Sequence, residues 1–125
     1  MTSILNIQNL SCGYPKFCLS DISFDILKGS FAGIIGPNGS GRTTLFRAIT
    51  GILPLNSGRI LLSGKILKSF SMRQRAQNIA IVSQFIEAGD MSVEDYVLMG
   101  RIPYHSRFNF FETEEDFEIA RKYME

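Results

Sequence analysis

Two segments near the start of the chain alternate apolar and polar residues. Residues 4–10 and 19–26 carry this pattern, which is typical of strands with one face buried. The sequence Cys-Gly-Tyr-Pro at 12–15 separates them and favours a turn. We therefore expect the two segments to pair as neighbouring strands.

Residues 31–35 and 79–82 are uninterrupted apolar runs, which predict strands buried on both faces of a sheet. Residues 59–62 predict a further short strand. Helices are expected over 42–50, ending near Gly51, and over 71–77.

The last third of the chain has helical patterns instead. Ser92 with Asp95 resembles a capping box, so a helix should begin there and end at Gly100. Thr113 with Asp116 should begin a second helix. The apolar positions on one side of this second helix, expected to be buried, are Phe117, Ala120 and Met124.

Between these two helices, residues 101–111 are rich in aromatic side chains and are expected to be irregular. We expect the aromatics to pack within the helical part. His105 is expected at the surface and receives no role.

Composition excludes several function classes. Thirteen basic residues are scattered among twelve acidic ones, so the net charge is +1 and nothing favours nucleic acid binding. Cys12 and Cys18 are expected to be ordinary thiols, with a disulfide as the less favoured alternative. The N-terminus does not resemble a signal peptide and no apolar run could span a membrane, so a cytoplasmic location is expected.

Residues 36–44 read Gly-Pro-Asn-Gly-Ser-Gly-Arg-Thr-Thr, between an apolar run and a helical pattern. This is the strand–loop–helix context of a phosphate-binding loop. Glycines let the backbone amides converge on phosphate oxygens, and the helix start adds unpaired N–H groups. A chance turn is the alternative, which the flanking elements disfavour. The predicted ATP-binding residues in this loop are Gly36, Asn38, Gly39, Ser40, Gly41, Arg42, Thr43 and Thr44.

Two side chains of this loop have separate expected roles. Thr43 stands where a hydroxyl coordinates Mg²⁺ between two phosphates. Arg42 occupies the position at which the motif has lysine. Its planar fork keeps the charge but not the geometry of an ammonium, so we expect binding to persist and hydrolysis to be impaired.

The loop resembles the Walker A motif of ATP-binding-cassette (ABC) ATPases, and the resemblance covers essentially all 125 residues. It implies an α/β, P-loop NTPase-like fold: the N-terminal half of an ABC ATPase, with a mixed sheet and the start of the helical subdomain. It divides the chain into a nucleotide-binding portion, 1–85, and the beginning of a helical subdomain, 86–125.

The resemblance also implies roles outside the loop. Tyr14, in a segment similar to the family's aromatic loop, would stack on adenine. Gln84, which ends a segment similar to the Q-loop strand, would contact Mg²⁺. Residues 92–104 look most like the subgroup that imports iron chelates, haem and cobalamin. Implied partners are a membrane permease, contacted through residues 84–111, and a second ATP-binding subunit, at the inner face of the cell membrane.

Residues 1–125 contain no motif resembling the family's signature sequence, its Walker B aspartate with the catalytic glutamate, or its switch histidine. No catalytic residue is therefore assigned, and these residues alone are expected not to turn over ATP. We also expect residues 31–35 to lack neighbouring strands, which favours self-association. Three interpretations stay open: an importer's ATP-binding subunit, a non-hydrolysing nucleotide-binding module, and a permease-docking protein without chemistry.

Overall fold

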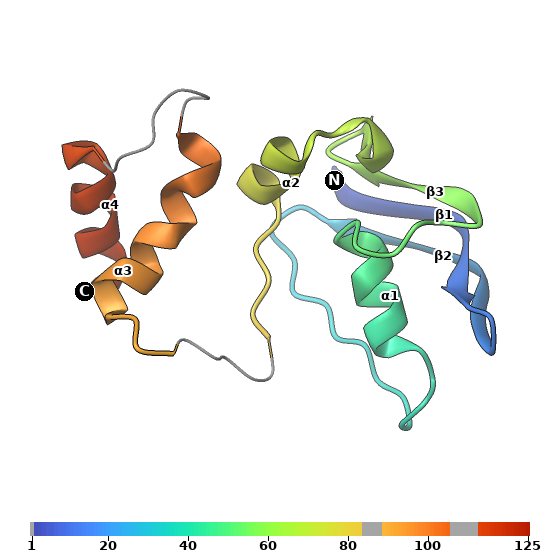
Figure 1. The fold of residues 1–125 in the computed structure, drawn as a ribbon. Coiled ribbons are helices and arrows are strands. Elements are labelled where there is room, and N and C mark those ends of the chain that lie inside the picture. Colours follow the sequence, from blue (N-terminus) through green and yellow to red (C-terminus); the bar gives the residue numbers. More distant parts are fainter. Residues whose placement is uncertain (1, 84–88, 106–112) are drawn as a thin grey trace. The chain divides into compact units, whose positions relative to one another are not determined.

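The computed structural model describes residues 2–83, 89–105 and 113–125. The chain forms two compact units, Met1–Ser71 and Met72–Glu125. The first holds the sheet and one α-helix, and the second holds the remaining α-helices (Figure 1). The predicted functional boundary at 85/86 is a different division and stays a prediction.

A four-stranded sheet forms the centre of the first unit, in the order β2-β1-β3-β4. All three pairings in this sheet are antiparallel. The predicted pairing of the first two strands is confirmed, and both strands are longer than the alternation indicated. The strands are β1 (Ser3–Tyr14), β2 (Phe17–Leu27), β3 (Ser57–Leu62) and β4 (Lys65–Ile66).

The core of this unit depends on an irregularity in β1. Ile7 and Leu10 are three positions apart, so simple alternation would place them on opposite faces. The register with β2 shifts between them, where Asn9 has a positive φ of 48°. Both side chains are therefore buried, together with Cys12. Cys12 and Cys18 are free thiols, and burial raises the pKa of the Cys12 thiol.

Helix α1 (Arg42–Ile49) packs against β1 with Leu45 and Ala48 buried. Its predicted end is confirmed. Gly51 has a positive φ of 85°, and its amide donates to the Ala48 carbonyl, which closes the last turn. The helix begins directly after the glycine-rich loop, so its packing on β1 fixes where that loop lies.

Residues 31–35 and 79–82 are not strands, which corrects the sequence prediction. Phe31 and Ile35 are 100% and 97% exposed, and Val82 is 89% exposed. An apolar run becomes a buried strand only when partner strands satisfy its backbone groups. The sheet of described strands includes neither segment.

The second unit is helical, with α2 (Met72–Asn78), α3 (Val93–Leu98), the 3₁₀ helix η2 (Met99–Tyr104) and α4 (Glu114–Met124). Both predicted N-caps are confirmed. The Ser92 hydroxyl accepts from the Asp95 amide at 3.1 Å, and Thr113 with Asp116 forms a complete capping box. The N-caps form because each hydroxyl satisfies an amide that the first helical turn leaves unpaired.

Three details of this unit differ from the prediction. Residues 101–104 belong to η2 and are not irregular, whereas residues 106–111 lie outside the described residues. Met124 is 37% exposed and is the last residue of α4. The buried positions of α4 are Ala120 and, unexpectedly, Asp116. Among the described helices, none has the length and apolarity needed to cross a bilayer.

Candidate functional site

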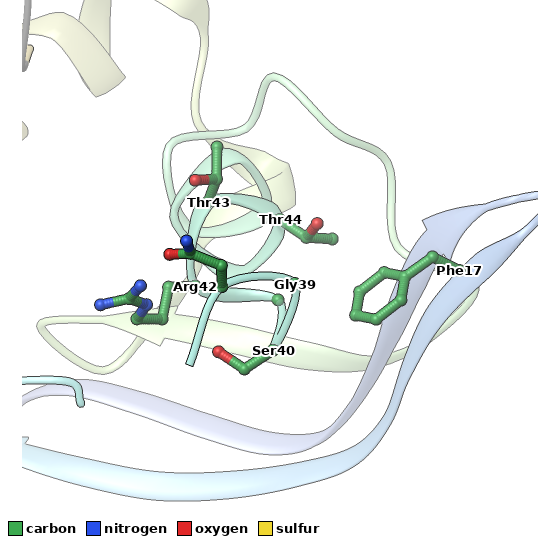
Figure 2. Close-up of a pocket in the computed structure, with 8 residues that line it drawn as sticks. Phe17, Gly39, Ser40, Arg42, Thr43 and Thr44 are labelled. Atoms are coloured by element: carbon green, nitrogen blue, oxygen red, sulfur yellow. The ribbon is translucent and has the colours of Figure 1, made fainter. Parts of the chain in front are cut away.

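A pocket of about 280 Å³ lies at the junction between the glycine-rich loop and α1. Seven consecutive residues of the loop and the first helical turn line it, and one aromatic residue from β2 completes it (Figure 2). Those residues are Asn38, Gly39, Ser40, Gly41, Arg42, Thr43, Thr44 and Phe17. The structure therefore brings seven of the eight predicted loop residues together in one pocket.

The backbone of the loop has the conformation that glycine permits. Gly39 and Gly41 have φ values of 83° and 103°, which other residues adopt only with strain. The Ser40 amide donates to the Pro37 carbonyl at 3.2 Å, so the loop turns tightly before α1 begins. The eighth predicted residue, Gly36, lies close to the side chain of Ser40, because a Cβ atom at position 36 would be 2.6 Å from Ser40 Oγ.

The first turn of α1 is suited to an anion. Gly41 is the N-cap, so no side chain caps the helix, and there is no acidic residue in its first turn. Amides at a helix start carry partial positive charge and attract anions when no side chain satisfies them. The loop and the helix start together offer a concave backbone surface that carries partial positive charge.

The side chains of the loop add a cation and three hydroxyls. Arg42 is exposed and makes no salt bridge within the described residues, so its guanidinium is available to an anion. In Figure 2 its side chain extends away from Phe17, with the loop backbone between them. The hydroxyls come from Ser40, Thr43 and Thr44. Thr44 is buried and Thr43 is exposed, so Thr43 is the more accessible ligand.

Of the two predicted site residues outside the loop, Tyr14 does not line this pocket. The Tyr14 hydroxyl accepts a hydrogen bond from Arg47 Nη1 at 2.8 Å, which links the tip of the β1–β2 hairpin to α1. Gln84 lies outside the described residues. Both assignments therefore stay predictions.

Sequence reasoning missed Phe17. The hairpin register pairs Tyr14 with Phe17 across a two-residue turn, so both aromatics stand at the same tip. Phe17 is the one that reaches the loop: a Cβ atom on Gly41 would lie 3.0 Å from its Cζ atom. The turn signal at 12–15 could have indicated this pairing, but not which aromatic faces the loop.

A second polar cluster, in the helical unit, was also missed. The Asp116 side chain is 4% exposed, and its carboxylate accepts from Arg101 Nε, His105 Nε2 and the Thr113 amide, each at 2.9 Å. The Arg101 guanidinium, followed by the Thr113 amide, holds the pKa of Asp116 well below its usual range. Arg101 also lies 4.5 Å from the centre of the Tyr104 ring.

This cluster corrects the expectation for His105. Its side chain is 14% exposed and contacts Asp116, so it is not a surface histidine. It directly follows η2, which ends at Tyr104, and its ring lies beside the first turn of α4. We regard the cluster as structural because it joins η2 to α4 and does not line the loop pocket.

Comparison with known proteins gives a consistent set of relatives. The family model "ABC transporter" matches residues 19–124. The chain is 37% identical over 123 residues to the uncharacterized ABC transporter ATP-binding protein YvrA of Bacillus subtilis, covering 97% of the chain and 28% of the relative. It is 41% identical over 93 residues to the hemin import ATP-binding protein HmuV of Pseudomonas fluorescens, covering 73% and 36%.

The ferric enterobactin transport ATP-binding protein FepC of Escherichia coli is 30% identical over 116 residues, covering 91% of the chain and 43% of the relative. A solved inward-facing metal-chelate type ABC transporter superposes with a TM-score of 0.70 at 25% identity, covering 97% of this chain and 44% of that one. The chain thus spans less than half the length of each relative named here.

Proposed function

This chain belongs to the ABC transporter family, and we propose that its residues 36–44 bind the phosphates of ATP together with Mg²⁺. Members of the family bind ATP, normally with Mg²⁺. The observation that carries the proposal is the pocket itself, where residues 38–44 surround an uncapped helix start. Anionic phosphate oxygens fit this surface because it presents amides, hydroxyls and one cation, and none of the lining residues carries a carboxylate.

The residues present also fit a magnesium ion held mainly by its substrate. Mg²⁺ keeps several waters and takes few protein ligands when phosphates supply the others. The exposed Thr43 hydroxyl in the first turn of α1 is the ligand this pocket would offer. Gln84 is proposed as a second contact on the family resemblance. When bound, Mg²⁺ would neutralise charge on the phosphates.

For the whole protein we propose the ATP-binding subunit of an importer of iron chelates, haem or cobalamin. The names of the hemin and ferric enterobactin relatives support the first two of these. ATP-binding subunits of importers work with membrane permease components and dimerise. We propose the permease contact through residues 84–111 and a peripheral location at the inner face of the membrane. The exposed apolar residues Phe31 and Ile35 support self-association of the chain.

A second candidate is a nucleotide-binding module that does not hydrolyse, and Arg42 is the observation that favours it. Its guanidinium fork prefers two parallel hydrogen bonds, whereas an ammonium acts as a compact point charge. Binding needs only the charge, but charge stabilisation during phosphoryl transfer needs the geometry. With Arg42 in place of lysine, we therefore expect the chain to bind ATP but to hydrolyse it poorly.

Calorimetric titration with Mg²⁺ present tests the proposed function. We expect saturable binding of ATP and of inorganic tripolyphosphate, and no binding of adenosine over the same concentration range. We expect the phosphate chain to be necessary for binding because the pocket's polar groups all belong to the phosphate loop. Adenosine binding as tightly as ATP, or an absence of tripolyphosphate binding, would overturn the proposal.

Substitution of Arg42 separates its charge from its shape. Arg42→Ala should weaken ATP binding about tenfold, or about 1.4 kcal/mol, because a charge-assisted hydrogen bond at an exposed site is lost. Arg42→Lys should stay within about threefold of the unchanged chain, because the charge remains. Both are measured by the same titration. Equal affinities for Arg42→Ala and the unchanged chain would show that the guanidinium does not contact phosphate.

A further inference from the structure

Gly41 is a point of close contact between the phosphate loop and the β1–β2 hairpin. Among the described residues, a Cβ atom on Gly39 would meet nothing within 4 Å, and one on Gly36 would meet only Ser40. A Cβ atom on Gly41 would instead lie 2.5 Å from Leu19 Cδ2 on β2. A leucine methyl group therefore occupies the space that any side chain at position 41 would need.

The position of Leu19 follows from the register of the hairpin. Leu19 pairs with Cys12 of β1, which is completely buried. Residues paired across two strands point to the same face of the sheet, so Leu19 points to the face that carries the core. Its side chain is half-buried. The sheet, and not the loop, thus determines where this side chain lies.

Gly41 is also the residue at which the loop becomes α1. It is the N-cap, has a φ of 103°, and offers no side chain to cap the helix. The amides of Arg42 and Thr43 follow it directly, in the helical turn whose N–H groups are left for an anion. A shift of Gly41 would therefore move donors that the proposed phosphate site depends on.

Leu19 can influence a bound phosphate only through this contact. The Phe17 ring also lies near position 41, with Cζ at 3.0 Å from the same Cβ position, but Phe17 itself lines the pocket. Leu19 is not among the lining residues, and its side chain carries neither charge nor hydrogen-bonding group. An effect of Leu19 on affinity would thus report the position of the loop.

Resting on the proposed function, we propose that Leu19 is a positioning residue for phosphate binding. Its methyl group fills the space beside Gly41 and holds the start of α1 at a fixed distance from β2. Binding groups must be held within about 0.5 Å of their productive positions by packing around them. A shortened side chain would leave a gap that the surroundings close only in part, so the loop would lose this support.

Other contacts should keep α1 on the sheet when Leu19 is shortened. The Tyr14 hydroxyl accepts a hydrogen bond from Arg47 Nη1 at 2.8 Å, which ties α1 to the hairpin tip. Leu45 and Ala48 are buried where α1 packs against β1. These contacts do not involve position 41. We therefore expect the change to be confined to the junction of the loop and the helix.

Titration with MgATP and magnesium tripolyphosphate tests the proposal, together with the amide NMR signals of Gly41 and Arg42. Leu19→Ala should shift both signals and weaken both ligands about tenfold, because the two ligands use the same amides. Leu19→Val is a smaller truncation that guards against misfolding, and it should weaken both ligands about threefold. Leu19→Met nearly keeps the volume and should restore both affinities to within about twofold of the unchanged chain.

Leu62→Ala is the matched control. Leu62 is a buried leucine of β3 in the same unit, and it neither lines the pocket nor lies among the atoms nearest to Gly41. Because Leu62 is more buried than Leu19, its truncation should lower the melting temperature at least as much. Both affinities, measured well below the melting transition, should stay within about twofold of the unchanged chain.

The contrary outcomes are distinct. Unchanged tripolyphosphate affinity in both Leu19→Ala and Leu19→Val would overturn the proposal. Equal losses of affinity in Leu62→Ala would overturn it too, because general loosening of the unit would then explain the effect. So would a loss of ATP binding with tripolyphosphate binding retained, since Leu19 would then act on the nucleoside. Failure of the unchanged chain to bind tripolyphosphate would instead refute the proposed function, before any variant is compared.

Discussion

Replacement of Gly39 by aspartate is expected to abolish MgATP binding. Gly39 lines the pocket, and no atom lies within 4 Å of the position that a Cβ would take there, so the new carboxylate would meet no steric clash, although the positive φ of 83° imposes some backbone strain. Two like charges about 4 Å apart repel by about 4 kcal/mol at an effective dielectric constant of about 20. Affinity should therefore fall more than a hundredfold, as measured by calorimetric titration.

Gly64 provides a closely matched control. Its φ of 79° is close to the 83° of Gly39, and a Cβ atom there also meets nothing within 4 Å. Gly64 lies in the turn between β3 and β4 and is not part of the pocket lining. Gly64→Asp should therefore impose similar backbone strain and leave ATP affinity unchanged. Equal losses of affinity in the two variants would show that backbone strain, and not charge in the pocket, explains the effect at position 39.

The parts of the fold that were predicted correctly from the sequence are formed by interactions between residues that lie close together in the sequence. The β1–β2 hairpin follows from alternation and a turn, and α1 follows from the glycine-rich loop and Gly51. The caps at Ser92 and Thr113 bond to amides three residues away. Each of these features is determined within a short segment, so a sequence pattern is sufficient evidence for it.

The failed predictions depend on distant partners. Residues 31–35 are apolar enough for a buried strand, but a strand forms only beside another strand, and apolarity does not say which. His105 and Asp116 are eleven residues apart and meet only because η2 and α4 direct them together. Phe17 reaches the pocket because the loop packs beside the hairpin tip. Local patterns contain none of this information.

Loss of the Asp116 carboxylate is expected to destabilise the helical unit selectively. Asp116→Ala would leave Arg101 and His105 without their shared acceptor and would remove one half of the capping box. We expect the melting temperature of this unit to fall by roughly 5–10 °C. Hydrogen exchange of α3, η2 and α4 should accelerate, while exchange of the β1–β2 hairpin, in the other unit, should not change.

Glu115→Ala is the control for this substitution. Glu115 lies in the same helical turn, so the two variants lose the same charge near the start of α4, but Glu115 is exposed. Its replacement should change the melting temperature by no more than one or two degrees. If Glu115→Ala and Asp116→Ala were equally destabilising, the effect would belong to helix-end charge and not to the buried cluster.

The same cluster predicts a dependence on pH with a definite sign. Because the pKa of Asp116 is lowered in the folded state, its contribution is fully present above the ordinary pKa of 3.8 that the group has in the unfolded chain. The contribution is lost as the pH falls below about 4, through the lowered folded value. Asp116→Asn, which cannot ionise, should therefore be less stable than the unchanged chain at pH 6. The difference should shrink steadily toward pH 2, since protonation of Asp116 in the unfolded state of the unchanged chain increasingly favours unfolding. Thermal melts of both chains at matched pH measure this difference in stability. The pH-dependent contributions of the other carboxylates are the same in both chains and cancel in the difference. A gap that stays constant from pH 6 to pH 2 would mean that the Asp116 charge does not hold Arg101 and His105 against α4.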